Sequence, residues 1–431
     1  MAQAAVTDVS MNADRSLTGW YRESSPKVRR VFWTCAGAWG LDSMDGFVFQ
    51  YMIPAIVAGL GLTLVQAGSI ASANYFAGAI GGWTGGWLAD RYGRARVLKI
   101  TILWFSIFSF LSGLAQDYQQ LLILRTIQGF GFGAEWAVGA VLLGELVAPQ
   151  HRGKALGAVQ SAAGPGSMLA AILAGPVAAS FGWRVSFFVG VLPALLVFFV
   201  RQEGDDAEIY TNAKARSLKA GRTFLPGAIF RPELRRLTAL ACLLALGSQG
   251  AGFAISNYLT TFLSQERGLS ISVAGIYVLF NSLGGFFGFL TNAYISDRVG
   301  RRNAFRYFAV GFIIAVNLYI FLPLGNSAFT LLPAGFCYGF FQFGIYASFG
   351  PYFTELFPTE VRATGQAFAY NFGRASSSLF ISGVALLAAS MNLSTGMVIM
   401  ACLAQSCAII ATLFLPETAG NRLKDIDAVR A

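Results

Sequence analysis

Four charged side chains lie inside long apolar stretches of the sequence, where ionised groups are rare. Asp42 and Asp45 lie near the middle of the first stretch, Arg125 lies in the fourth, and Arg374 lies in the eleventh. If these stretches cross a membrane, each charge costs ~2.5–3.5 kcal/mol at the centre of its helix, and the four together cost roughly 10 kcal/mol before pairing. We therefore interpret them as a functional polar site.

The two aspartates could carry a proton. They are three residues apart, so they lie on neighbouring parts of one helical face. Two nearby carboxylates in poorly solvated surroundings repel each other, which favours the binding of a proton by at least one of them. The only histidine, His151, lies in a basic turn and is not available for this task. The alternative is that one aspartate neutralises Arg125 or Arg374.

The two arginines could bind an anion between the halves of the chain, because Arg125 and Arg374 come from opposite halves. The planar guanidinium binds carboxylates through paired hydrogen bonds, which favours a carboxylic acid, and phosphate would also suit. The alternative is internal pairing of each arginine with Asp42, Asp45 or Glu135. Further polar residues in the apolar stretches complete the predicted binding set, with hydrogen bonds between helices as their alternative role: Gln128, Asn257, Tyr258 and Asn371.

The elements that position these residues are predicted to be membrane helices. Apolar residues make up 55% of the 431 and charged residues only 12%, whereas about 25% of a soluble chain is charged. Stretches of about 20 apolar residues can cross a bilayer, and their backbone groups must pair within the stretch, as in a helix. Such stretches lie near 31–58, 64–89, 97–115, 119–143, 155–179, 185–200, 237–263, 273–295, 307–323, 329–352, 363–389 and 395–415, which makes twelve.

The twelve stretches divide into two similar halves. The turn Asp90–Arg94, after the second stretch, recurs 207 residues later as Asp297–Arg301, after the eighth. The segment Glu145–Arg152, after the fourth, recurs 210 residues later as Glu355–Arg362, after the tenth. Two motif pairs in the same order and at nearly the same offset indicate a duplicated half.

The repeated turns could join the two halves on one side of the membrane. Asp90 can accept hydrogen bonds from helix N-termini and from arginine, and Gly93 permits a sharp turn. Such a contact would separate when the halves move. The alternative is that the arginines only set the topology. The residues assigned to this gating role are Asp90, Arg91, Gly93, Arg94, Glu135, Glu145, Arg152, Asp297, Arg298, Gly300, Arg301, Glu355 and Arg362.

The distribution of basic residues predicts the orientation. All but four of the 31 lysines and arginines lie in the two tails and in the turns on the same side as the tails. This predicts that both termini lie in the cytoplasm. We expect the membrane to be the inner membrane of a bacterium. Anionic lipid at that surface accounts for the net charge of +10, so no nucleic-acid partner is needed.

The expected organisation has five parts. An N-terminal cytoplasmic tail over 1–30, without the pattern of a signal peptide, precedes a six-helix bundle over 31–200. A cytoplasmic linker over 201–236, with short surface helices or disordered, leads to a second bundle over 237–415. A cytoplasmic tail over 416–431 follows.

These features resemble the major facilitator superfamily, from about residue 30 to residue 420. The resemblance depends on the twelve stretches in two halves and on the turn Asp90–Arg94 with its copy. It implies the major facilitator fold, an all-α membrane protein with two pseudo-symmetric six-helix bundles that rock about a central site.

A narrower resemblance is to the organic-acid:proton symporters, which include aromatic-acid, sialate and lactate-type monocarboxylate carriers. It depends on the motif Asp42-x-x-Asp45-Gly46-Phe47 in the first stretch, which Pro54 follows, on the glycine-rich Gly129–Trp136 and on charged residues already named, Arg125, Glu145, Arg152, Arg362 and Arg374. It implies Asp42 and Asp45 in proton coupling, Arg125 and Arg374 at the carboxylate, and Glu145 with Arg362 in gating. The aromatic-acid branch typically has Asp-Gly-x-Asp in helix 1, whereas this chain has Asp42-Ser-Met-Asp45, which leaves the size of the acid open.

The sequence thus predicts a proton-coupled uptake carrier for a small organic anion, which works as a monomer in the lipid bilayer without metal or cofactor. No nucleophile or metal-ligand pattern suggests an enzyme. A carboxylate exchanger or efflux antiporter is the alternative, because Gly164–Gly166 and Gly175-Pro176 partly match a helix 5 motif of superfamily antiporters. Prolines in a flexing helix explain that motif equally well. A non-transporting membrane receptor is a more remote alternative.

Overall fold

The computed structural model describes residues 19–196, 206, 210–212, 215, 225–269, 271–321, 328–388 and 390–420. Regular secondary structure within these residues is helical throughout. The elements of the first half are α2 (Gly19–Glu23), α3 (Pro26–Leu60), α4 (Leu64–Tyr92), α5 (Arg94–Ser112), α6 (Tyr118–Leu146), η1 (Pro149–His151), α7 (Arg152–Ser161), α8 (Ala163–Ile172), η2 (Leu173–Val177), α9 (Ala178–Phe181), α10 (Trp183–Phe188), η3 (Val189–Val191) and α11 (Pro193–Leu196).

The second half has the same kind of organisation. Its elements are η5 (Pro226–Phe230), α13 (Pro232–Ser256), α14 (Leu259–Gln265), α15 (Ile271–Val299), α16 (Arg301–Phe321), α17 (Ala328–Gly344), η6 (Ile345–Ser348), α18 (Phe349–Leu356), η7 (Thr359–Val361), α19 (Arg362–Ser376), α20 (Ser378–Ala388) and α21 (Leu393–Phe414).

Helices occupy every predicted apolar stretch, although five of the stretches consist of consecutive shorter helices. Length and composition alone qualify six described helices as membrane spans.

Two long helices begin before the apolar stretches that the sequence predicts. The first, α3, begins at Pro26, inside the predicted tail 1–30, because Ser25 caps it and proline suits the first turn. Likewise, α13 begins at Pro232, inside the predicted linker 201–236. The rest of that linker lies largely outside the described residues.

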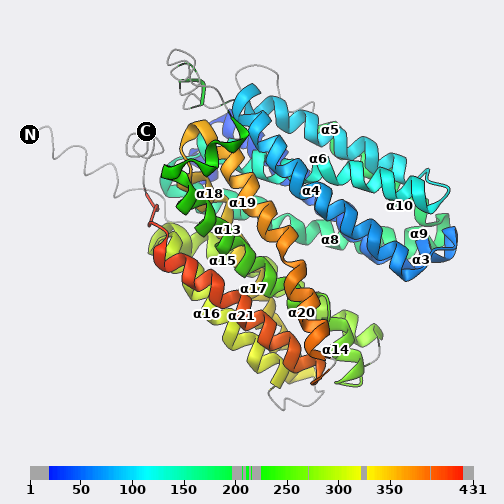
Figure 1. Cartoon of the computed structure of the whole chain (residues 1–431). Helices are drawn as coiled ribbons and strands as arrows, with labels where there is room; N and C mark the ends of the chain where they lie inside the picture. The colour runs from blue at the N-terminus through cyan, green and yellow to red at the C-terminus, as the bar shows by residue number, and fades with distance from the viewer. Residues whose placement is uncertain are drawn as a thin grey trace, which may run out of the picture.

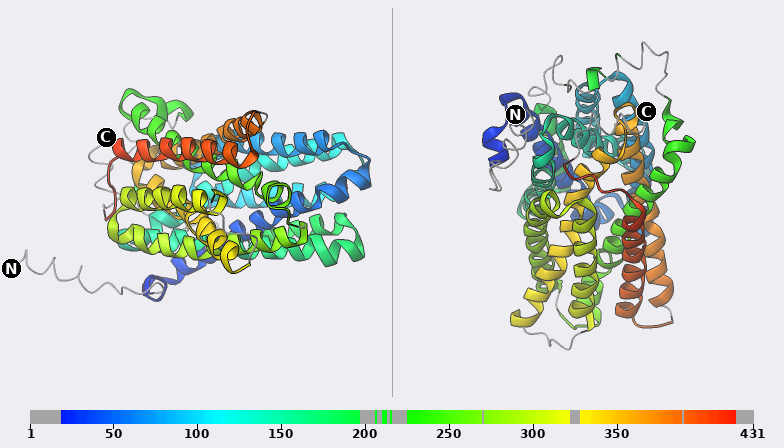
Figure 2. Two further views of the ribbon diagram at one scale, coloured as in Figure 1. Left: turned by 90° about the horizontal axis from the view of Figure 1, so that it is seen from below. Right: turned by 90° about the vertical axis from the view of Figure 1, so that its left-hand side faces the viewer.

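The two bundles meet at one end of the molecule and diverge towards the other, as the ribbons in Figure 1 show. The most extensive contacts between helices of the two halves are those of α4 with α19 and of α7 with α15. Glycine permits both contacts, because a Cβ on Gly86 would lie 2.4 Å from the carbonyl oxygen of Ala363, and one on Gly157 would lie 2.2 Å from Cβ of Ala293. The views in Figure 2 show the long helices of both bundles running along the same general direction.

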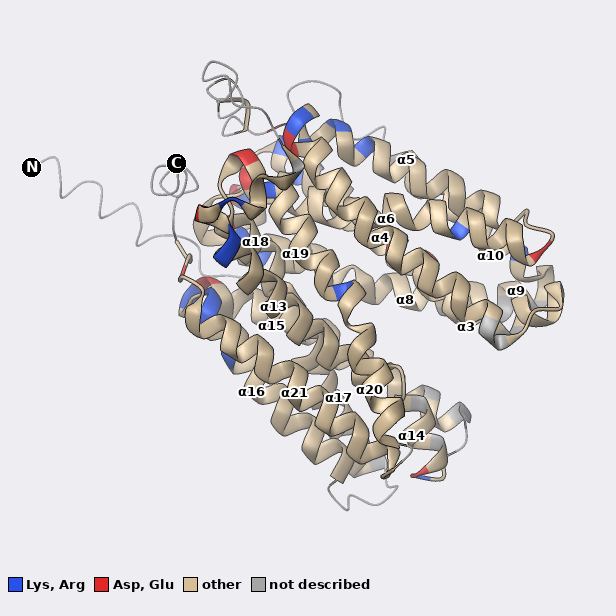
Figure 3. Ribbon diagram, viewed as in Figure 1, with Lys and Arg blue, Asp and Glu red and all other residues tan. Residues whose placement is uncertain are grey.

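Charged residues gather at the end where the bundles meet, which we call the charged end (Figure 3). Most of the remaining helical ribbon consists of residues without charge. Large apolar side chains are exposed along the helices, among them Phe76, Ile107, Leu283, Ile314 and Leu386. An apolar surface of this extent is expected where helices face lipid.

Candidate functional site

Asp45 lies in a buried ion pair within the first half. Nη1 of Arg125 is 2.8 Å from Oδ2 of Asp45, and Nε2 of Gln128 donates a hydrogen bond of 2.6 Å to the same oxygen. The hydroxyl of Ser109 donates to the other carboxylate oxygen. The side chains of Arg125 and Asp45 are only 4% and 5% exposed. In this conformation Arg125 is therefore paired with a carboxylate of its own half.

Asp42 has different surroundings, although it is one helical turn away. Both of its carboxylate oxygens are buried and have no hydrogen-bond partner among the described residues. Glu135, on α6, resembles it, because its Oε2 is also buried without a partner. Whole-residue exposure is 1% for each. A buried carboxylate without a partner is costly when ionised, so these two groups are candidates for binding a proton.

Arg374 projects from α19 of the second half towards the first half. Its guanidinium carbon lies 4.1 Å from the centre of the Phe132 ring and 4.9 Å from that of Tyr75. Both rings belong to the first half and can attract a cation. Among the described residues Arg374 has no ion pair and no hydrogen bond. Its charge is thus attracted by aromatic faces only, which leaves the donors of its guanidinium group for another acceptor.

The other residues predicted to bind substrate contact backbone carbonyls. Nδ2 of Asn371 donates to the oxygen of Gly133 at 2.9 Å, which links α19 to α6 across the two halves. Nδ2 of Asn257 donates within its own helix, and the hydroxyl of Tyr258 donates to Ile381 at 3.1 Å. In this conformation Asn371 and Tyr258 connect helices, whereas Asn257 does not.

An aromatic contact joins the halves between Arg374 and the charged end. Tyr370 lies one turn from Arg374 on α19, and its ring centre is 4.1 Å from that of Trp136 on α6. The Trp136 ring also lies 6.0 Å from Trp39 of α3. This contact and the hydrogen bond of Asn371 both join α19 to α6 across the two halves.

The first charge cluster, at the charged end, joins Asp90 to the N-terminus of α19. Asp90 accepts hydrogen bonds from the backbone nitrogens of Ala363 and Thr364, at 3.1 and 2.8 Å, and from the Thr364 hydroxyl at 2.6 Å. A carboxylate at a helix N-terminus also interacts favourably with the helix dipole. Arg94 completes the contact, with Nη2 at 3.0 Å from Asp90.

Glu145 belongs to the same cluster and provides its second bridge across the halves. Its Oε1 is 2.7 Å from Nη1 of Arg362 in the second half and 3.4 Å from Nη2 of Arg94 in the first. All three side chains are fully buried. Arg94 therefore lies between the two carboxylates, Asp90 and Glu145, and links them.

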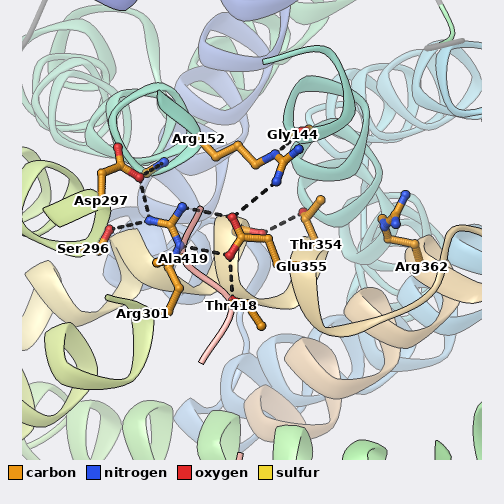
Figure 4. Close-up of polar contacts among 12 residues, drawn as sticks. Gly144, Arg152, Ser296, Asp297, Arg301, Thr354, Glu355, Arg362, Thr418 and Ala419 are labelled. Carbon is orange, nitrogen blue, oxygen red and sulfur yellow. Dashed lines mark hydrogen bonds and ion pairs between the residues drawn. The ribbon is translucent and has the colours of Figure 1, made fainter. Parts of the chain in front are cut away.

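The second charge cluster repeats these contacts with the halves exchanged (Figure 4). Asp297 accepts from the backbone nitrogens of Gly153 and Lys154, both at 2.9 Å, which begin α7. Arg301 lies 2.7 Å from Asp297 and 3.0 Å from Glu355. Arg152 of the first half approaches Glu355 at 3.5 Å. The repeat seen in the sequence is thus a repeat of contacts, and each copy joins one half to the other.

Besides Glu135, four residues assigned to gating lie outside the contacts of the two charge clusters. Arg91 and Arg298 lie over aromatic rings, of Trp87 and Tyr294 respectively, outside the two clusters. Gly93 and Gly300 have φ angles of 112° and 96°, which favour glycine. The glycines therefore form the turns, whereas the two arginines do not contribute to the bridges.

Comparison with known proteins identifies the family. The profile described as Major Facilitator Superfamily matches residues 36–382. The chain belongs to the major facilitator superfamily. A probable 4-methylmuconolactone transporter of Cupriavidus pinatubonensis is 39% identical over 411 residues, which cover 94% of this chain and 95% of the relative. A cis,cis-muconate transport protein of Acinetobacter baylyi is 29% identical over 382 residues, 88% of this chain and 92% of the relative.

Solved structures of the superfamily have the same fold. The proton:xylose symporter XylE, bound to 6-bromo-6-deoxy-D-glucose, matches with a TM-score of 0.74 at 18% identity, over 95% of this chain and all of that one. The fold of this superfamily member is therefore the major facilitator fold, and the protein is a membrane transporter and not an enzyme.

Two acidic residues of this transporter were not found by the sequence reasoning. Oδ1 of Asp206 accepts from the nitrogen of Ala95 at 2.9 Å, next to Gly93, and Oε1 of Glu417 accepts from the nitrogen of Arg301 at 2.7 Å, next to Gly300. They follow the last helix of each half, and their numbers differ by 211, so the repeat offset could have revealed them.

Proposed function

We propose that this transporter takes up a small organic acid as its anion, together with protons, by alternating access to a site between the two halves. The observation that carries the proposal is the guanidinium of Arg374, which faces the other half without an anionic partner among the described residues. A cation at membrane depth is costly unless it binds a partner. A carboxylate suits it, because it can accept two of the parallel N–H donors.

The compounds named for related transporters support a carboxylic acid over phosphate. They include 4-methylmuconolactone, cis,cis-muconate and sialic acid, compounds that carry a carboxyl group. The two rings beside Arg374, those of Phe132 and Tyr75, offer apolar faces for the rest of such a molecule. The substrate we propose is therefore a small acid with a compact apolar or unsaturated body.

Proton coupling is assigned to the carboxyl groups of the first transmembrane helix. Asp45 holds Arg125 by an ion pair, and a proton on Asp45 would weaken that pair and free the arginine. Asp42, three residues away, is buried without a partner. Binding of a proton in this group would therefore change the contacts between α3 and α6, which pack against each other.

The direction of uptake follows from the orientation we propose, with both termini in the cytoplasm of a bacterial inner membrane. The charged end would then face the cytoplasm, in agreement with the excess of lysine and arginine there. The bundles diverge towards the opposite side, so acid and proton would enter from outside. Opening of the two charge clusters would release them, and one chain would suffice for this cycle.

The proposal is tested by uptake into vesicles that contain the purified protein. The probes are radiolabelled cis,cis-muconate, 4-methylmuconolactone and 3-(3-hydroxyphenyl)propionate, with an acidic exterior. We expect the wild type to accumulate at least one of them. Arg374→Ala should abolish uptake, since the loss of a charge-assisted bidentate contact costs about 1.5–3 kcal/mol per hydrogen bond. Arg236→Ala, which removes an exposed arginine, is the control.

Three results would overturn the proposal. Uptake at the wild-type rate by Arg374→Ala would remove the anion-binding role of that residue. Uptake that ignores the pH gradient but rises when unlabelled acid is trapped inside would establish an exchanger. Absence of flux for every probe, together with tight binding, would indicate a receptor.

A further inference from the structure

Three uncharged polar side chains of the second half meet between α13 and the end of α17 without satisfying their hydrogen bonds. Ser248 and Gln342 are only 2% and 4% exposed, and Tyr346, in η6, is partly buried. The Ser248 hydroxyl is buried without a partner. No hydrogen bond joins the Gln342 amide or the Tyr346 hydroxyl to another residue that the structure describes. Polar groups at membrane depth are costly to bury unless something satisfies them.

Gly252 of α13 brings these side chains together. A Cβ on Gly252 would lie 2.0 Å from Nε2 of Gln342 and 2.7 Å from the hydroxyl oxygen of Tyr346. Ser248 lies four residues before Gly252, so it belongs to the same face of α13. The absence of a side chain at position 252 permits this approach. We call Ser248, Gln342 and Tyr346 the neutral cluster, because none of them carries a charge.

The neutral cluster lies at about the same depth in the membrane as Arg374. Nε2 of Gln249 donates a hydrogen bond of 2.8 Å to the carbonyl oxygen of Tyr370, which joins α13 to α19. Both helices start at the charged end, where their beginnings contact a common apolar cluster. Counted from that hydrogen bond, Gly252 is three residues further along α13 and Arg374 is four residues further along α19. These steps correspond to about 4.5 and 6 Å along the two helices.

The neutral cluster also lies on the side of the second half that meets the first. The short helix η6, which carries Tyr346, packs against α7 of the first half. The Tyr346 ring contacts that of Phe349 at 5.9 Å, and Phe349 contacts the Tyr370 ring at 5.7 Å. Tyr370 in turn contacts Trp136 of the first half. Because Arg374 also faces the first half, one molecule between the halves can contact both Arg374 and the neutral cluster.

The chemistry of the neutral cluster favours an uncharged oxygen. Arg374 is the only lysine or arginine in the six apolar stretches of the second half. A second carboxylate bound beside Gly252 would therefore lack a counter-ion, which is strongly unfavourable. Amides and hydroxyls both donate and accept hydrogen bonds. They can bind a hydroxyl or a carbonyl group equally well.

We propose that the neutral cluster binds a second, uncharged oxygen of the transported acid while Arg374 binds its carboxylate. This inference rests on the proposed function and narrows the substrate to monocarboxylates with a hydroxyl, keto or lactone group. Dicarboxylates are poorer ligands, because their second charge finds no cation. Of the three probes named above, 4-methylmuconolactone and 3-(3-hydroxyphenyl)propionate have the required groups, whereas cis,cis-muconate has a second carboxylate.

Equilibrium binding to the purified protein tests the proposal with matched pairs of acids. 3-(3-Hydroxyphenyl)propionate is compared with 3-phenylpropionate, and 4-methylmuconolactone is compared with cyclopent-2-enylacetate, whose ring contains no oxygen. Isothermal titration calorimetry at neutral pH measures each Kd. We expect the wild type to bind the oxygenated member of at least one pair about tenfold more tightly than its partner. Binding of cis,cis-muconate should be no tighter than that of the members without the second oxygen.

The variants alter the neutral cluster while they leave Arg374 in place. Tyr346→Phe and Gln342→Leu should each lower the preference to about twofold or less, with the Kd of the other member within about twofold of the wild type. Gly252→Ala keeps every polar group but displaces two of them, and should have the same effect. Tyr319→Phe, which removes a buried hydroxyl from α16, is the control and should retain the preference.

Arg374→Ala distinguishes failure of this inference from failure of the proposed function. It should weaken both members of a pair alike, by about tenfold or more, since both contain the carboxylate. If the wild type binds both members equally, or prefers cis,cis-muconate, the inference is overturned and the role of Arg374 stands. Equal weakening of both members by Tyr346→Phe, Gln342→Leu and Gly252→Ala would assign the cluster to structure and also overturn it.

Two further outcomes concern the proposed function. If the wild type binds none of these acids, the proposed function fails and the inference fails with it. If Arg374→Ala binds both members like the wild type, the proposed role of Arg374 fails. A preference that is then still lost in Tyr346→Phe would support the neutral cluster as the site of the second oxygen.

Discussion

At the scale of single residues, the partner of each charge decides its role. Arg125 and Arg374 are both arginines in apolar helices, but Arg125 is bound to Asp45 at 2.8 Å, whereas Arg374 lies against aromatic rings. The first arginine stabilises its own half in this conformation. The second is left to bind something else, which is why we assign the carboxylate to it.

The pair of Asp45 and Arg125 makes a stability prediction. Arg125→Ala leaves a buried carboxylate without its cation and should destabilise the protein by about 3–5 kcal/mol. The double variant Asp45→Asn, Arg125→Gln should recover most of this loss, because no uncompensated charge remains. Thermal unfolding of the purified variants in one detergent measures both effects. If the double variant is less stable than Arg125→Ala, the ion pair does not account for the cost.

At the scale of helices, small residues determine how closely the halves approach. Gly86 of α4 faces α19 so closely that a Cβ would lie 2.4 Å from the oxygen of Ala363, whereas nothing lies within 4 Å of a Cβ on Gly68 of the same helix. Larger side chains at the first position cannot fit without separation of the two helices. The contact is therefore specified by shape as well as by charge.

These two glycines predict opposite effects of the same substitution. Gly68→Ala should stabilise the protein by up to ~1 kcal/mol, because alanine favours the helix and meets no atom. Gly86→Ala should destabilise it by about 1–3 kcal/mol through the clash with α19. Thermal unfolding compares the two variants. A stabilising effect of Gly86→Ala would show that α4 and α19 are not in close contact in solution.

At the scale of the whole molecule, the two charge clusters hold the halves together at the charged end. Asp90 caps α19 of the second half, and Asp297 caps α7 of the first, so each half supplies the acid for the other's helix. The two clusters make corresponding contacts in the two repeats, and both lie at the same end of the molecule. A rocking motion of the bundles that separates the halves at this end must therefore break both clusters.

Neutralising either cluster should therefore shift the protein towards separation of the halves at the charged end. Charge-assisted hydrogen bonds contribute about 1.5–3 kcal/mol each, so Asp90→Asn and Asp297→Asn should each shift the equilibrium by roughly tenfold or more. Spin labels at the exposed positions Tyr92 and Val299, in a background without native cysteines, measure the distance between the halves. Glu233→Gln, at an exposed position, is the control, and an unchanged distance distribution in both aspartate variants would contradict the role of the clusters.

The sequence by itself determined the helices, their grouping into halves and the likeness of the turns. This follows from the membrane, since a lipid-facing segment must be apolar and must satisfy its own backbone, which leaves a local signal about 20 residues long. The offset of 207 residues between Asp90 and Asp297 likewise needs no coordinates. The resemblance to organic-acid symporters also rested on motifs within single segments, such as that around Asp42.

Only the tertiary structure decided which of these residues meet. The sequence left open whether Arg125 binds an anion or Asp45, and the packing of α3 against α6 selects Asp45 in this conformation. It also brings Asp206 and Glu417 to the turns that begin α5 and α16. Such contacts join residues more than a hundred positions apart, and their geometry depends on how whole helices pack. No local pattern of residue types contains that information.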